Sequence, residues 1–133
     1  MHDPKWNPNP EAVVRAFFAE LGRGGGLISA VETYMADDCR WENTGLPSAD
    51  SKQQILAMMQ GFIDGYQLHA LVIDVIALAV GGDVVLTERV DHMDTADGTR
   101  LLSFPLAGTL TVRDGLITRW SDYFDPRPLL PGA

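Results

Sequence analysis

The sequence predicts an α+β fold, in which N-terminal helices pack against the concave side of a curved antiparallel sheet. The apolar residues before position 65 recur with the period of an α-helix, whereas those after it alternate as in β-strands. Three turn signals, Gly-Gly at 81–82 and Asp-Gly at 97–98 and 114–115, divide the second half into strands. Helices and a curved sheet arranged in this way enclose a cone-shaped cavity, which is the expected place for chemistry.

Three helices are expected in the first half. The first begins at Asn9, an N-cap residue followed by proline and glutamate, and ends at the glycine-rich segment 22–26. A second, short helix covers residues 27–36. The third begins at a capping box at Ser51 and ends at Gly65.

The strands follow from the turns. A short strand is expected at residues 40–44, and four longer strands are expected at residues 67–80, 83–94, 99–113 and 116–125. Because short turns join neighbouring strands in antiparallel pairs, the four longer strands form a meander. The proline-rich end, residues 125–133, is expected to be irregular.

Size and charge exclude several classes of protein. A chain of 133 residues fits one domain, here expected to span residues 1–133. A formal net charge of -8 argues against binding to nucleic acid or to an anionic membrane. There is no apolar run of membrane-spanning length and no signal peptide, and the single cysteine, Cys39, rules out an internal disulfide. A cytoplasmic location is therefore expected.

Three of the expected strands mix polar and apolar side chains on one face. By alternation these sets are Arg89, Asp91 and Met93 with Thr87; Trp120, Asp122 and Phe124; and Trp41 with Asn43. An Arg–Asp pair alone is also common on solvated strand faces. If the three mixed faces all line the cone, then Asn43, Arg89, Asp91 and Asp122 converge.

Two carboxylates and one guanidinium in a poorly solvated cavity carry a surplus negative charge. The surplus is relieved when one acid keeps its proton and the pair titrates as a coupled unit. The planar fork of Arg89 can bridge both acids. A neutral acid beside an ionised base suits concerted general acid–base catalysis.

Three segments carry a resemblance to a known family. "RVDHMD", "RWSDYFD" and the upstream "WENTGLP" resemble the limonene-1,2-epoxide hydrolase family, and the similarity extends from the first helix to about Phe124. That family has the cone-shaped, cystatin-like α+β fold of nuclear transport factor 2, which ketosteroid isomerase and the SnoaL-like polyketide cyclases share. The resemblance implies hydrolysis of an epoxide to a vicinal diol without a metal or an organic cofactor.

The resemblance also implies a role for each residue. Arg89 matches the arginine that bridges two acids, Asp91 the acid that protonates the epoxide oxygen, and Asp122 the base that deprotonates water. Asn43 matches the asparagine that holds this water. Trp41 stands where the family has a tyrosine, and an indole can donate a hydrogen bond but cannot accept one.

The substrate and partner predictions are coarser. An apolar pocket is expected from Met58, Met59, Phe62, Met93, Leu106, Trp120 and Phe124. A homodimer is expected from the family and from apolar residues such as Val112, Ile117 and Tyr123 on the outer face of the sheet. A SnoaL-like cyclase, a ketosteroid-isomerase-like proton shuttle and a non-catalytic module that binds a hydrophobic ligand are the alternatives.

Overall fold

The fold, seen in a computed structural model that describes residues 9–130, consists of helices followed by a five-stranded sheet. The helices and the strand between them are α1 (Pro10–Gly22), α2 (Leu27–Tyr34), β1 (Met35–Asn43) and α3 (Lys52–Tyr66). The remaining elements are β2 (Leu68–Gly81), β3 (Val84–Thr95), β4 (Arg100–Arg113), β5 (Leu116–Tyr123) and a 3₁₀ turn, η1 (Arg127–Leu129). The expected fold class is confirmed. The boundaries of β2 to β5 lie within two residues of those expected, whereas β1, expected at residues 40–44, already begins at Met35.

The sheet has the strand order β1-β5-β4-β3-β2. Strands β2 to β5 form the antiparallel meander expected from the three short turns. β1 adds to the outer side of β5 in parallel, so that Asn43 lies opposite Asp122. This pairing joins segments about 80 positions apart, and no local signal in the sequence predicts it.

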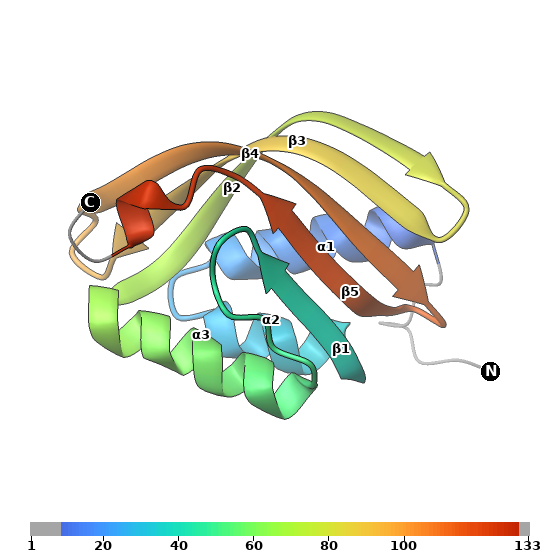
Figure 1. Cartoon of the computed structure of the whole chain (residues 1–133), viewed down its shortest axis with the longest axis horizontal. Helices are drawn as coiled ribbons and strands as arrows, with labels where there is room; N and C mark the ends of the chain where they lie inside the picture. Colours follow the sequence, from blue (N-terminus) through green and yellow to red (C-terminus); the bar gives the residue numbers. More distant parts are fainter. Residues whose placement is uncertain (1–8, 131–133) are drawn as a thin grey trace.

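The sheet arches over the helices, and α1, α2 and α3 lie on its inner side (Figure 1). Local signals begin two of these helices as expected. The Asn9 side chain accepts a hydrogen bond from the Ala12 backbone N–H, and the Ser51 side chain accepts one from Gln54. The apolar stripe of α1 is buried against the sheet, with Phe17 and Leu21 fully covered.

The second helix is shorter than expected. α2 ends at Tyr34, and Met35 is already extended and opposite Ile117 of β5. The apolar character of Met35 suited a helix face equally well, so the expected end at residue 36 was wrong. Pairing with β5 decides where the helix stops, which is a tertiary effect that overrides local propensity.

A bulge in β5 changes which residues face inward. The register of β4 and β5 shifts between Thr111 and Val112, so strict alternation fails near the start of β5. Ile117, expected on the outer face, is instead fully buried, and Val112 is buried with it in the core. The expectation that these two residues form an outer contact surface is therefore wrong, whereas Tyr123 is exposed.

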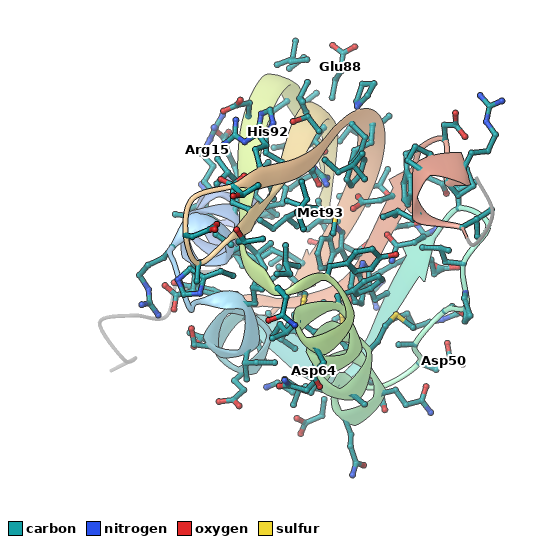
Figure 2. The ribbon with its side chains drawn as sticks, turned by 90° about the vertical axis from the view of Figure 1, so that its left-hand side faces the viewer. Arg15, Asp50, Asp64, Glu88, His92 and Met93 are labelled. Carbon is teal, nitrogen blue, oxygen red and sulfur yellow. The ribbon has the colours of Figure 1, made fainter. Side chains whose placement is uncertain are left out.

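Side chains on the two faces of the sheet differ in surroundings. Glu88 projects outward from the sheet, whereas Met93 lies in the interior (Figure 2).

Within residues 9–130, no helix has the length and apolarity needed to cross a membrane. The last residues of the expected irregular end, 131–133, lie outside the described residues.

Candidate active site

Arg89, in the middle of β3, holds two carboxyl groups. Its Nε and Nη2 donate to Asp91 at 3.2 and 2.9 Å, and its Nη1 and Nη2 donate to Asp122 at 3.1 and 3.0 Å. Asp91 lies two residues further along the same face of β3, as alternation predicts. Asp122 comes from β5, which is separated from β3 by one strand. Each carboxylate therefore receives two charge-assisted hydrogen bonds from one guanidinium.

These three charged groups are almost completely removed from solvent. The exposed fractions of Arg89, Asp91 and Asp122 are 0%, 2% and 4%. The ring of Phe18, on α1, lies against the guanidinium with its centroid 4.8 Å from Cζ. The sequence also allowed Arg89 and Asp91 to lie on a solvent-exposed face of the strand. Their burial excludes that alternative.

Burial and charge change the acid–base behaviour of the group. Burial raises the pKa of Asp122 to about 6, and the charge and hydrogen bonds of Arg89 only partly oppose this rise. Burial alone would lower the pKa of Arg89, but the charges and hydrogen bonds of Asp122 and Asp91 raise it above its ordinary value. Arg89 therefore stays charged, while Asp122 is ionised at neutral pH and still retains appreciable basicity.

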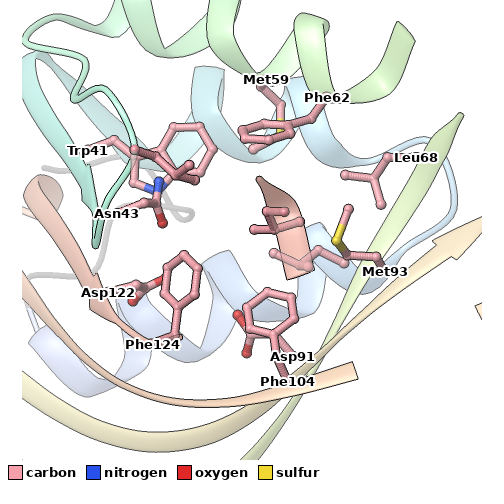
Figure 3. Close-up of a pocket in the computed structure, with 13 residues that line it drawn as sticks. Trp41, Asn43, Met59, Phe62, Leu68, Asp91, Met93, Phe104, Asp122 and Phe124 are labelled. Atoms are coloured by element: carbon pink, nitrogen blue, oxygen red, sulfur yellow. The ribbon is translucent and has the colours of Figure 1, made fainter. Parts of the chain in front are cut away.

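The two acids lie at the wall of an apolar cavity of about 60 Å³, several times the room needed by one water molecule. Figure 3 shows both carboxyl groups on the sheet side, facing Met59 and Phe62 on α3. The remaining lining residues are Trp41, Asn43, Leu46, Leu68, Leu71, Met93, Phe104, Phe124 and Leu129. Of all the lining residues, only Asp91 and Asp122 have ionisable side chains.

Asn43 and Trp41 reach the cavity from β1. The Asn43 amide lies close to the Asp122 carboxyl in Figure 3, in line with their pairing in the register. Trp41 stacks on Trp120, with centroids 4.8 Å apart. The buried Trp41 Nε1 has no hydrogen-bond partner among residues 9–130, so the indole shapes this wall without bonding to Asn43 or Asp122.

Three residues expected in the pocket do not line it. Trp120 lies behind Trp41 and packs edge-on against Phe17, with ring centroids 5.1 Å apart. Leu106 is buried opposite Arg89 in the register but lies outside the cavity wall. Met58 is only partly buried, because its neighbour Met59 takes the position on α3 that faces the cavity. The other expected pocket residues, Met59, Phe62, Met93 and Phe124, line the cavity.

The sequence reasoning missed several residues around the site. Phe104 and Leu106 are two residues apart on β4, so alternation counted from Leu106 was an unused signal for Phe104. Leu46 and Leu129 belong to a turn and to η1, where no periodicity marks an inward side chain. Gly108, beneath Arg89, has no side chain that a motif search would single out.

Other groups in the described chain offer less for catalysis. Burial, reinforced by repulsion from Asp38, raises the pKa of the Cys39 thiol to about 12, so its reactive thiolate is scarce at neutral pH. No cluster of three or more His, Cys, Asp or Glu side chains suited to a metal ion occurs within residues 9–130.

Known proteins with similar sequences and structures show which family the chain belongs to. Residues 8–132 match the family described as the limonene-1,2-epoxide hydrolase catalytic domain. The chain is 30% identical over 108 residues to epoxide hydrolase EphG of Mycobacterium tuberculosis, covering 79% of this chain and 67% of that protein. A solved structure of an M. tuberculosis LEH-like epoxide hydrolase has a TM-score of 0.72 at 25% identity, covering 89% of this chain and 84% of that one.

The fold is shared more widely than the sequence. A putative SnoaL-like polyketide cyclase from Jannaschia sp. CCS1 has a TM-score of 0.70 at 18% identity, covering 97% of this chain and 93% of that one. Such a likeness supports the fold alone, since one fold hosts many functions. The match over nearly the whole chain, together with the relative in M. tuberculosis, decides the family: this chain belongs to the limonene-1,2-epoxide hydrolase family.

Proposed function

We propose that the protein adds water to apolar epoxides in one step and releases vicinal diols. The observation that carries the proposal is the pair of buried acids, bonded to one arginine, at the wall of an apolar cavity. The lining is apolar apart from Asn43 and the two acids, which suits an apolar epoxide, and the acids lie where the strained oxygen and a water molecule can meet them. The Met59 and Met93 side chains can adapt to rings of different shape.

Each residue has one role in the proposed reaction. Asp122 takes a proton from a water molecule that Asn43 orients, and the water oxygen forms a bond to one epoxide carbon. The bond from this carbon to the epoxide oxygen breaks, and Asp91 gives its proton to that oxygen. A proton then returns from Asp122 to Asp91, so no covalent intermediate forms and the site is restored.

The charge balance supports a pair in which one acid is ionised and the other protonated. With Arg89 charged, one ionised acid makes the group neutral, and a second ionised acid would leave an unpaired buried charge. Asp122, with a pKa of about 6, is suited to act as the base at neutral pH. Asp91, the other acid bonded to Arg89, is assigned as the group that gives a proton to the epoxide oxygen.

The direct test is diol formation from cyclohexene, styrene and limonene oxides. We expect the wild-type protein to form diols from at least one of them, and Asp122→Asn and Asp91→Asn to lose at least about 100-fold in kcat. Glu88→Gln is the matched control, because Glu88 lies beside Arg89 in sequence but on the outer face. Full diol formation by Asp122→Asn would exclude the mechanism.

The same assay separates the alternatives. Turnover of an activated ketone without diols would favour a cyclase or a ketosteroid-isomerase-like proton shuttle. Such enolate chemistry requires hydrogen-bond donors that face one base, rather than two acids joined by an arginine. Saturable binding of limonene without turnover would favour a ligand-binding module.

The proposal extends to a homodimer in the cytoplasm. Leu86, Ala107 and Tyr123 line a shallow hollow on the outer face, and 54% of Tyr123 is exposed. Light scattering after size exclusion should give twice the monomer mass for wild type and the monomer mass for Tyr123→Glu. A monomeric wild type would contradict the proposed homodimer.

The proposed cytoplasmic location agrees with the single cysteine, which is buried and free, as expected in a reducing compartment. Cell fractionation can test it.

A further inference from the structure

A row of three residues that includes Asp122 crosses the sheet next to the Arg89 guanidinium. Thr87 on β3, Gly108 on β4 and Asp122 on β5 are direct cross-strand partners. Gly108, in the middle of this row, has no side chain. The guanidinium of Arg89, which starts two residues further along β3 on the same face, occupies the resulting space.

The space at Gly108 exists only because the residue is glycine. A Cβ placed there would overlap with Asp122 Oδ1 and would lie 2.6 Å from Arg89 Nη1. The Gly108 backbone has an ordinary negative φ, so the requirement concerns room and not backbone conformation. Any larger residue would push apart the groups that form two of the four Arg89–carboxylate bonds.

Thr87 completes the hydrogen bonding of Arg89. A guanidinium has five N–H groups, and four of them donate to Asp91 and Asp122. The fifth, on Nη1, donates to Thr87 Oγ1 at 3.1 Å, and the Thr87 hydroxyl donates to the Gly108 carbonyl at 2.9 Å. Because the hydroxyl proton is committed to this carbonyl, a lone pair of Oγ1 is left for Nη1.

We infer that Thr87 and Gly108 are positioning residues: together they hold the Arg89 guanidinium in the one place from which it bonds both acids. Arg89 Nη1 bonds both Thr87 and Asp122, so loss of the hydroxyl weakens the hold of Arg89 on Asp122 most directly. The kinetic consequence rests on the proposed epoxide hydrolysis, but the placement of the guanidinium does not.

Weaker contact with Arg89 changes the titration of Asp122 in a known direction. Burial raises the pKa of Asp122, and Arg89 is the main group that opposes this rise. A displaced guanidinium therefore moves the midpoint of Asp122 to higher pH. The charged groups that act on the pKa of Asp122 are Arg89 and Asp91. The side chains that α3, β1, β2, β4 and the C-terminal segment contribute to the cavity are uncharged, whereas Glu42 and Tyr123 lie with Asp122 along a second hollow on its other side.

The kinetic experiment compares wild type, Thr87→Val and Thr87→Ser in epoxide hydrolysis between pH 5 and 9. Valine keeps the shape and removes the hydroxyl, whereas serine keeps the hydroxyl. We expect Thr87→Val to lose about tenfold in kcat/KM at pH 7, which is the value of one hydrogen bond to a charged group. We also expect its acid limb to move to higher pH, and Thr87→Ser to restore both.

Thr109→Val is the matched control. It removes a threonine hydroxyl that accepts from Arg119 on the outer face of β4, away from the cavity. We expect it to leave the pH profile unchanged. An unchanged profile in Thr87→Val, or equal damage in Thr87→Ser, would overturn the inference.

A second measurement does not depend on activity. The ¹³C signal of the Asp122 carboxyl reports its titration by NMR, with a midpoint near pH 6 expected in wild type. We expect a higher midpoint in Thr87→Val and in Gly108→Ala, each shown to be folded by circular dichroism. If wild type hydrolyses no epoxide, the proposed function fails, and this midpoint still decides the positioning role. Equal midpoints in wild type and Thr87→Val would refute it.

Discussion

The buried charge of Asp122 should make the protein's stability depend on pH in a particular way. The pKa of this carboxyl rises from its usual 3.8 to about 6 on folding, chiefly because burial disfavours the ionised form. The folded state therefore binds this proton more tightly than the unfolded state does. The resulting stabilisation is complete below about pH 3.8 and is lost as the pH rises through about 6.

The size of this effect follows from the two pKa values. Each pKa unit corresponds to about 1.4 kcal/mol, so Asp122 changes the free energy of unfolding by about 3 kcal/mol across this range. Asp122→Asn removes this titration and leaves Asp91 as the one acid bonded to Arg89. The free energy of unfolding of wild type minus that of Asp122→Asn should therefore fall by about 2–3 kcal/mol between pH 4 and pH 7.5.

Urea denaturation at a series of pH values measures this difference. Taking the difference cancels the contribution of acids outside the site such as Glu20, whose pKa the hydrogen bond from Arg23 lowers to about 2. Asp37→Asn is the matched control, because Asp37 is exposed and its removal leaves the buried group intact. A difference that stays constant across the pH range would show that Asp122 is not an acid whose pKa is raised by burial.

Three further predictions follow from the site. As the pH falls below about 6, protonation of Asp122 should lower kcat/KM by about tenfold per pH unit, and a profile without this acid limb would contradict its role as base. Arg89→Met should lower the free energy of unfolding at pH 7 by about 3–5 kcal/mol in urea denaturation, because it leaves two buried acids without their cation; an unchanged midpoint would argue against the buried group. Met93→Ala should enlarge the cavity and so raise the ratio of kcat/KM for limonene oxide to kcat/KM for cyclohexene oxide. It should also lower the free energy of unfolding by about 2–5 kcal/mol. An unchanged ratio would show that the substrate binds elsewhere.

Local signals in the sequence explain much of the fold. Asn9 and Ser51 cap their helices through their own side chains, and glycine-containing turns separate the strands of the meander. Alternation in β3 places Arg89 and Asp91 on one face, because successive side chains of a strand point to opposite sides. These features depend on residues only a few positions apart.

Other features depend on contacts between distant segments. The bulge in β5 reverses the side on which Ile117 was expected, although Trp120 and Asp122, beyond the bulge, face inward as predicted. The parallel pairing of β1 with β5 brings Asn43 beside Asp122. Gly108 leaves room because it has no side chain. This room matters only because Arg89 on β3 and Asp122 on β5 fill it.

The sequence by itself determined the helix starts, the meander, the residues on each face of β3 and the resemblance to a family of hydrolases. The tertiary structure alone decided that Arg89 is sealed from solvent with all its N–H groups bonded, and that Met59 rather than Met58 faces the acids. The physical reason is that capping, turns and alternation are local properties of the chain. Burial and the completeness of a hydrogen-bond network are instead properties of the packed molecule, and they set the proton affinity of Asp122.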